Sequence, residues 1–275
     1  MVSAEPPAFS MAALAVAVTA FTFTSTLLVS SPLPNILTIW VFLITLASIN
    51  EAVVTSVAFV LSFTSESLKE LQNANVKKEK MQNILSSVGI NVSRDESEDL
   101  YMDYISEELS LKSDGTIDSE INAFNINLAL EVKKDLDIQR YPLYIANVEN
   151  EKFYVIPLRG AGLWAEIWGY IALREDINTI KGVSFDHKSE TAGLGAEITE
   201  DWFINSFNDE KIKDIQGEFV GIYVSKSNND PDNNDKMDNE IDAISGATIT
   251  GDGVSDMIKE RIQNYLPYFN KISNE

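Results

Sequence analysis

No lysine or arginine occurs before Lys69, and two long apolar runs, at about 12–30 and 36–63, fill most of this N-terminal stretch. A helix of about 20 apolar residues crosses the ~30 Å hydrocarbon core of a bilayer. The first run lacks the basic start of a signal peptide and is followed by Ser-Ser-Pro-Leu-Pro, so it fits a short spanning helix that ends in a turn. We therefore expect residues 1–64 to anchor the chain in a lipid bilayer.

The second run contains an ionisable residue, Glu51. A carboxyl group at the centre of a span costs roughly 2.5–3.5 kcal/mol. Each strongly apolar residue between Ile44 and Phe63 favours insertion by about 0.3–0.6 kcal/mol, so insertion of the whole run is favoured. Glu51 then is protonated or reaches toward the interface, or it contacts a partner subunit, and the sequence leaves both interpretations open.

The composition excludes several functional classes. The chain has 42 acidic and 21 basic residues, so it repels phosphate backbones and nucleic-acid binding is not expected. It contains no cysteine, which removes disulfides, thiolate nucleophiles and iron–sulfur ligation. A single histidine, His187, argues against a zinc or iron site made within the chain, and we expect it in a surface loop.

Residues 65–275 carry the pattern of a mixed domain. The alternating runs 142–148 and 152–158 flank Glu149-Asn-Glu151, which predicts a β-hairpin although its turn lacks glycine. Strands mixed with terminal helices indicate an α+β fold with an antiparallel sheet. The other expected elements are strands at 169–173, 180–185 and 219–224, a helix over 65–89, an acidic helix start over 93–101, and a turn at Asp114-Gly115.

The segment 226–240 is rich in Asn and Asp, and its alternating acidic and amide side chains resemble the start of a calcium-binding loop. The rest of that pattern fails, because position six is Asp235 instead of glycine and position twelve is Ile241 instead of glutamate. We therefore interpret the segment as a solvated insertion and expect no metal site.

The stretch Asp242-Ala-Ile-Ser-Gly-Ala-Thr248 places one hydroxyl among very small residues. The backbone N–H groups of Ser245, Gly246 and Ala247 can approach a phosphate closely, and Gly246 can adopt a left-handed conformation. Such a turn before a helix is more often purely structural than functional when it is judged by its mechanics alone.

A helix is expected directly behind this turn. Asp252 is a suitable N-cap, and apolar residues then recur at three and four positions until Pro267 ends the run. A phosphate beside Thr248 would lie near the positive end of the helix dipole.

Trp164 and Trp168 lie four residues apart, so both could face one core. Glycine on both sides of the pair suits a turn that presents Trp164 to a flat ring instead.

Three of these stretches carry a resemblance to a known family. Asp242–Thr248 resembles the flavinylation motif, Asp-x-x-Ser/Thr-Gly-Ala-Thr, of the FMN-binding subunits of membrane redox complexes. Glu190-Thr-Ala-Gly-Leu-Gly195 resembles their second signature, in which proline usually stands at the place of Ala192, and Gly160–Trp164 followed by Trp168-Gly-Tyr170 resembles a third. From about Glu66 onward the chain is most similar to the C subunit of the sodium-translocating NADH:quinone oxidoreductase, with the shorter G subunit of the RNF complex as a relative.

The resemblance implies an FMN attached to Thr248 through a phosphoester bond and added by a separate flavin transferase with FAD as donor. It implies an electron relay from NADH toward quinone, with no catalytic residue of its own, among the other subunits of a sodium-pumping complex in the bacterial inner membrane. The alternatives are an RNF-type subunit and a non-redox, membrane-tethered binding protein. The expected cofactor-binding residues are Asp242, Ser245, Gly246 and Ala247 at the attachment turn and Trp164, Glu190, Thr191, Gly193, Leu194 and Gly195 at the flavin ring.

The charge pattern and the resemblance predict opposite sides of the membrane for residues 65–275. Lys69, Lys77, Lys78 and Lys80 follow the apolar run and favour a cytoplasmic domain. The resemblance implies that residues 65–275 face the periplasm. Long domains cross a membrane largely regardless of charge, so we expect the periplasmic side.

Overall fold

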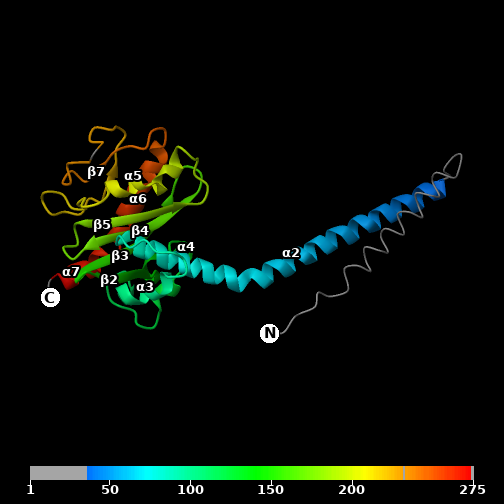
Figure 1. Ribbon diagram of the computed structural model, residues 1–275, viewed down its shortest axis with the longest axis horizontal. Helices are drawn as coiled ribbons and strands as arrows, with labels where there is room; N and C mark the ends of the chain where they lie inside the picture. Colours follow the sequence, from blue (N-terminus) through cyan, green and yellow to red (C-terminus); the bar gives the residue numbers. More distant parts are fainter. Residues whose placement is uncertain (1–35, 232, 274–275) are drawn as a thin grey trace. The chain divides into compact units, whose positions relative to one another are not determined.

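The computed structural model describes residues 36–231 and 233–273 (Figure 1). The chain divides into two compact units, residues 1–73 and 74–275. The apolar run at 12–30 lies outside the described residues.

Helix α2 is continuous from Ile36 to Ser87, so the apolar run at 36–63 and the helix expected over 65–89 form one element. The helix contains no glycine or proline, and it ends just before Gly89, where the sequence predicts its end. Gly89 has a φ of 88°, and the Ile90 N–H donates to the Leu85 carbonyl at 3.0 Å, as in a Schellman cap. Among the described residues, one helix is long and apolar enough to cross a membrane; it is the Asn50–Ser87 part of α2, and its apolar window is not buried by other parts of the protein.

A five-stranded antiparallel sheet forms the centre of the second unit, with its strands in sequence order, and this confirms the predicted α+β class. The expected hairpin is present, because Val148 pairs with Glu151. Its turn residues Glu149 and Asn150 have φ values of 52° and 68°, which is the geometry of a type I′ turn built without glycine. The strands are β1 (Ile105–Leu111), β2 (Tyr141–Val148), β3 (Glu151–Ala161), β4 (Glu166–Arg174) and β5 (Ile180–His187).

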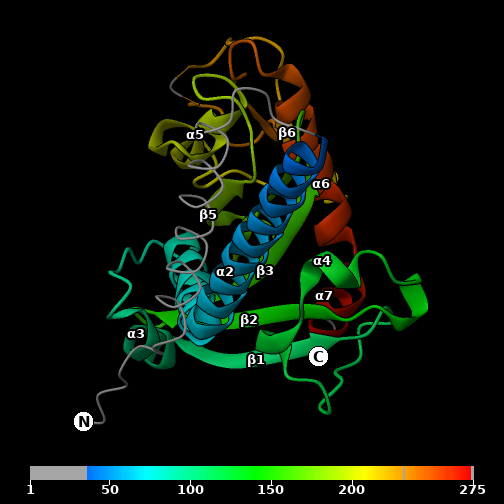
Figure 2. The ribbon, with the colours of Figure 1, turned by 90° about the vertical axis from the view of Figure 1, so that its right-hand side faces the viewer.

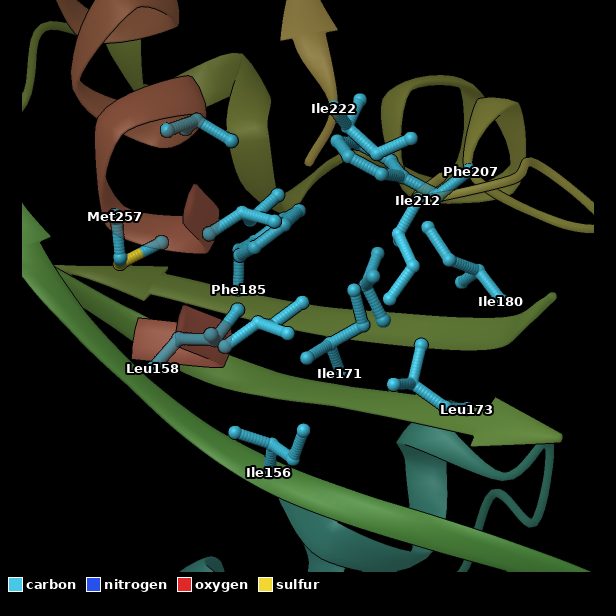
Figure 3. Close-up of a cluster of buried hydrophobic side chains, with 14 of the residues drawn as sticks. Ile156, Leu158, Ile171, Leu173, Ile180, Phe185, Phe207, Ile212, Ile222 and Met257 are labelled. Carbon is cyan, nitrogen blue, oxygen red and sulfur yellow. The ribbon is translucent and has the colours of Figure 1, made fainter. Parts of the chain in front are cut away.

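Both faces of the sheet are buried, because alternate side chains of each strand enter different cores. On β2, for example, Tyr144 packs with the end of α2 and with α3 (Ser97–Tyr104), whereas Ile145 packs on the opposite face. That opposite face is covered by α5 (Asp201–Ser206), α6 (Thr248–Gln263) and α7 (Leu266–Ile272). Figure 3 shows this second core, where Ile156, Phe185 and Met257 come from a strand, a second strand and a helix.

The remaining elements are short. Strand β1 was not predicted, and the strand expected at 219–224 is reduced to β6 (Tyr223–Val224), because Gly221 turns the chain at a φ of 82°. β6 pairs in parallel with β7 (Glu240–Ile241) across the segment 226–240. The other elements are η1 (Ala123–Asn125), α4 (Leu128–Glu131), η2 (Leu136–Ile138) and η3 (Gly195–Thr199).

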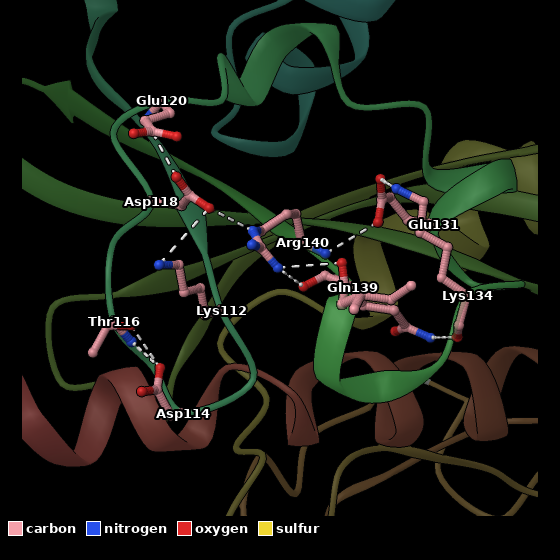
Figure 4. Close-up of polar contacts among 10 residues, drawn as sticks. Lys112, Asp114, Thr116, Asp118, Glu120, Glu131, Lys134, Gln139 and Arg140 are labelled. Atoms are coloured by element: carbon pink, nitrogen blue, oxygen red, sulfur yellow. Dashed lines mark hydrogen bonds and ion pairs between the residues drawn. The ribbon is translucent and has the colours of Figure 1, made fainter.

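The connection from β1 to β2 is held by a polar network at Arg140 (Figure 4). The Arg140 Nε–H donates to Asp118 Oδ2 at 2.7 Å, and the Arg140 backbone N–H donates to Glu131 Oε2 at 3.1 Å. The expected turn at Asp114-Gly115 is present, with a φ of 77° at Gly115.

Candidate functional site

Thr248 is the first residue of α6 and its side chain is exposed. The prediction of Asp252 as the N-cap is wrong, since the helix begins four residues earlier. Ala247 is buried and its carbonyl accepts the first helical bond from the Gly251 N–H at 2.9 Å, while Asp252 lies within the helix and pairs with Lys226 at 3.7 Å. No side chain caps this end of α6, and the first N–H groups of an α-helix have no partner within it.

The turn before α6 has the backbone that its small residues allow. Gly246 adopts the left-handed conformation, with a φ of 74°, and Ser245 and Gly246 are exposed beside Thr248. Side-chain bulk at position 246 would meet Leu194, because a Cβ there would lie 2.8 Å from Leu194 Cδ2. The Glu190–Gly195 stretch and the Asp242–Thr248 stretch are therefore in direct contact.

Asp242, the first residue of the motif, holds the neighbouring loop. Its Oδ1 accepts hydrogen bonds from the backbone N–H groups of Asn229 at 3.1 Å and Asp230 at 3.4 Å. The carboxylate of Asp230 is in turn occupied by the Asp235 N–H at 2.9 Å. These carboxylates thus shape the segment 226–240, and among the described residues no group of His, Asp and Glu side chains is arranged to hold a metal ion.

Glu190 joins two of the three motif stretches to α6. Its Oε1 accepts from the Trp164 N–H at 2.9 Å and the Ala165 N–H at 3.4 Å, and its Oε2 accepts from the Thr250 hydroxyl at 2.8 Å. Burial alone would raise the pKa of the Glu190 carboxyl, but these hydrogen bonds outweigh it and the pKa lies below its ordinary value. The buried group is therefore a carboxylate with partners on both oxygens.

Trp164 lies on the turn between β3 and β4, and its side chain is 68% exposed. The turn is closed by the Gly162 N–H, which donates to the Ala165 carbonyl at 2.8 Å. Trp168 belongs to β4, where it pairs with Asp186, so the two tryptophans do not share a core. An exposed indole on a turn whose backbone is anchored by a buried carboxylate suits contact with a bound ring.

The loop that follows Glu190 is exposed. The Thr191 carbonyl accepts from the Leu194 and Ala196 N–H groups at 3.0 and 3.1 Å, and Gly193 has a φ of 74°. Gly195 is buried against Glu190. His187 is half-buried at the end of β5, not in a surface loop as expected, and its Nδ1 accepts from the Glu190 N–H at 3.2 Å.

Thr250 was missed by the sequence analysis. It lies four residues before Val254 and therefore on the apolar face of α6, where it is 1% exposed. A threonine on a buried helix face needs a hydrogen-bond partner, and that requirement was the available signal.

These contacts bring the three stretches together at the N-terminal end of α6. Thr248 is the first residue of α6, and Leu194 contacts Gly246 in the turn before it. The Glu190 carboxylate accepts hydrogen bonds both from the Trp164 backbone N–H and from the hydroxyl of Thr250 in the first turn of α6. Leu163 and Ile249, neighbours of Trp164 and Thr248 in sequence, are also exposed apolar side chains. A hydroxyl at a helix N-terminus beside exposed apolar side chains fits a ligand with a phosphate and a flat apolar ring.

The chain is similar in sequence to known proteins. Residues 162–263 match the sequence model of the family described as "FMN-binding domain". The C subunit of the Na(+)-translocating NADH-quinone reductase of Neisseria meningitidis is 32% identical over 136 residues, covering 48% of this chain and 50% of that protein. The corresponding protein of Vibrio parahaemolyticus is 26% identical over 218 residues, covering 72% of this chain and 82% of that protein. The chain spans about half the length of the first of these curated relatives.

Two solved structures share the fold. The C subunit of the Na(+)-translocating NADH-quinone reductase of Parabacteroides distasonis is 36% identical, with a TM-score of 0.66 over 73% of this chain and 96% of that one. NqrC of Shewanella oneidensis, at 24% identity and a TM-score of 0.59, covers 72% of this chain and 99% of that one, and it shows the fold alone.

Proposed function

Because the chain belongs to the family of C subunits of Na(+)-translocating NADH-quinone reductases, we propose that it is a membrane-anchored flavoprotein subunit that carries FMN covalently on Thr248. It relays electrons from NADH toward quinone among the other subunits of a sodium-pumping respiratory complex. The observation that carries the proposal is that three separate stretches meet at the N-terminal end of α6, the helix whose first residue is the exposed Thr248.

The attachment is a phosphoester. Thr248 Oγ1 forms a bond to the FMN phosphorus, the diphosphate bond of FAD breaks, and AMP and the hydroxyl proton leave. Thr248 is exposed, so a separate flavin transferase can reach it. The uncapped N–H groups at the start of α6 and the positive end of its dipole stabilise the bound phosphate, and Ser245, Gly246 and Ala247 keep the approach free of bulk.

The side chains of the other two stretches would hold the flavin ring. Trp164 and Leu194 offer exposed aromatic and apolar surface, Thr191 is exposed beside them in sequence order, and Gly193 shapes the loop of Thr191 and Leu194. Glu190 supports the Trp164 turn from below and Gly195 packs against Glu190, whereas Asp242 begins the attachment turn and holds the segment 226–240. FMN supplies reversible electron storage when bound, and the protein supplies attachment, orientation and the surroundings that tune the potential.

The anchor is residues 1–64, and residues 65–275 form the domain on the periplasmic side of the inner membrane. The exposed apolar segment of α2 supports the anchor, since an apolar window of that length that is covered by none of the described residues needs lipid or another membrane helix. Glu51 is exposed on α2, which supports a contact with a partner subunit within the membrane.

The proposal is tested by producing the full chain together with a flavin transferase. Covalent flavin fluorescence on a denaturing gel, and an added mass equal to one FMN less one water, are expected for the wild type and for Ser245→Ala, and neither for Thr248→Ala. Fluorescence that persists in Thr248→Ala would contradict the attachment site. A wild-type chain without flavin would favour the non-redox binding protein instead.

A further inference from the structure

We propose that Thr250 and Glu190 are a positioning pair, in which the Thr250 hydroxyl orients the Glu190 carboxylate and this carboxylate fixes the Trp164 turn against α6. The inference rests on the proposed function, since it concerns the surface on which the flavin lies. Neither residue contacts the flavin in this arrangement; both act through Trp164.

Thr250 is turned away from any surface ligand. Its side chain is 1% exposed, and its hydroxyl donates a hydrogen bond to Glu190 Oε2 at 2.8 Å. Thr248, two residues earlier on the same helix, is exposed. The two threonines therefore have different tasks, because one is open to modification and the other holds an internal contact.

Glu190 acts on Trp164 through the backbone. The Trp164 indole is 68% exposed, so little of the protein surrounds it and its place depends on the turn that carries it. Two N–H groups of that turn, those of Trp164 and Ala165, donate to Glu190 Oε1. A supporting group of this kind sets the position of a contact residue without touching the ligand.

The pair is fitted to one geometry. A Cβ atom on Gly162 would lie 2.6 Å from Glu190 Oε1, and one on Gly195 would lie 2.4 Å from Glu190 Oε2 and 2.6 Å from Thr250 Oγ1. Glycines in two of the motif stretches thus make the space that the carboxylate fills. Loss of the Thr250 hydroxyl would leave one buried carboxylate oxygen without a donor, so the carboxylate must move or the site must open.

The first test uses the flavin-free full chain in detergent, produced without the transferase. Hydrogen exchange of the peptide around residues 162–167 is compared between the wild type, Thr250→Val and Thr250→Ser. We expect exchange at Trp164 and Ala165 to be about tenfold faster in Thr250→Val, corresponding to about 1.4 kcal/mol, and near the wild-type rate in Thr250→Ser, which keeps the hydroxyl.

Thr179→Val is the matched control. Thr179 is also buried, and its hydroxyl also donates to a carboxylate, that of Asp176, but it lies at the β4–β5 hairpin. A general loss of stability would affect both valine variants, whereas the proposal requires that only Thr250→Val changes exchange at 162–167.

The second test uses the flavin-loaded chain. Thr248 is intact in Thr250→Val, so the covalent flavin content is expected to equal that of the wild type. Its fluorescence per bound flavin is expected to rise, because an indole held against the ring quenches it, and Thr250→Ser is expected to restore the quenching. If the wild type takes up no flavin, the proposed function fails and this inference with it. If the wild type is loaded and Thr250→Val changes neither exchange nor fluorescence, the inference alone is overturned.

Discussion

The side chain of Leu194 rests on the backbone of Gly246, with Cδ2 2.8 Å from the place that a Cβ atom would take. Gly246 also has a φ of 74°, where an L-residue is strained by about 1–2 kcal/mol. Gly246→Ala therefore combines strain with a collision. We expect it to lower the free energy of unfolding, measured by chemical denaturation of the full chain in detergent, and to lower the flavin yield.

Gly217→Ala separates these two effects. Gly217 has a φ of 83°, but a Cβ atom there would meet nothing within 4 Å. The backbone strain is the same as at Gly246, but the collision is absent. Gly217→Ala should therefore lower the free energy of unfolding by about 1–2 kcal/mol, and Gly246→Ala should lower it by more. An equal decrease in the free energy of unfolding of the two variants would show that the Leu194 side chain moves away from the new methyl group at no energetic cost.

Glu210 should make stability depend on pH. Its side chain is fully buried; Oε1 accepts from the Asn233 amide at 2.8 Å and lies 3.5 Å from the Lys236 ammonium group, whereas Oε2 has no hydrogen-bond partner among the described residues. Burial raises the pKa of Glu210 from 4.5 to about 7, against the opposing effects of Asn233 and Lys236. The folded domain therefore holds this proton at pH values where the unfolded chain has released it.

It follows that the contribution of Glu210 to stability is full below pH 4.5 and is lost as the pH rises through about 7. The loss is about 3 kcal/mol at most. Glu210→Gln removes the titrating proton and keeps an acceptor for Asn233. The free energy of unfolding, measured at several pH values between 5 and about 8, should therefore change less with pH in this variant than in the wild type. Glu218→Gln, at an exposed carboxyl, is the control. An unchanged pH profile in Glu210→Gln would contradict the prediction.

Arg140 should stabilise the β1–β2 connection through geometry as well as charge (Figure 4). The hydrogen bond from Arg140 holds the pKa of Asp118 below its ordinary value, despite partial burial. Arg140→Lys keeps the charge but loses the Nε–H donor and the contacts of Nη1 with the Ile138 and Gln139 carbonyls. We expect a lower Tm at pH 7, and a difference that shrinks as the pH falls below 3.8 and Asp118 takes up a proton. Arg94→Lys, at an exposed position, should leave Tm unchanged.

The chain contains no cysteine, so a single introduced cysteine reports the side of the membrane. Asn228 is exposed in the segment 226–240 and is a suitable position for Asn228→Cys. A membrane-impermeant thiol reagent that enters the periplasm should label this variant in intact cells. Labelling that requires rupture of the inner membrane would place the domain in the cytoplasm.

The sequence predicts the parts of the fold in which local pattern and tertiary environment agree. The hairpin at Glu149 and the strands on either side have clear apolar runs, and the helix that ends at Gly89 has a clear stop signal. Strand β1 was missed because it follows α3 without a turn and is buried only at its two ends. The β6–β7 pair depends on a contact across the segment 226–240, which local periodicity does not encode.

The candidate site divides in the same way. The attachment turn, the exposed Trp164 and the Glu190 stretch are visible as short motifs. That they meet at one end of α6 depends on how this helix packs beside β3 (Figure 2), and this packing is not encoded in any single motif. The hydrogen bond of Thr250 to Glu190 could not be predicted for the same reason.

The hydrogen bond between Thr250 and Glu190 joins residues 60 positions apart, and that between Glu190 and Trp164 joins residues 26 apart. During synthesis, the tryptophan turn and the glutamate leave the ribosome well before α6 does. The carboxylate then has backbone donors on one oxygen and no hydroxyl for the other until α6 has emerged. Contacts of such long range close late in folding. A chain truncated before α6 would therefore contain two of the three flavin motifs and still lack the surface that they form together.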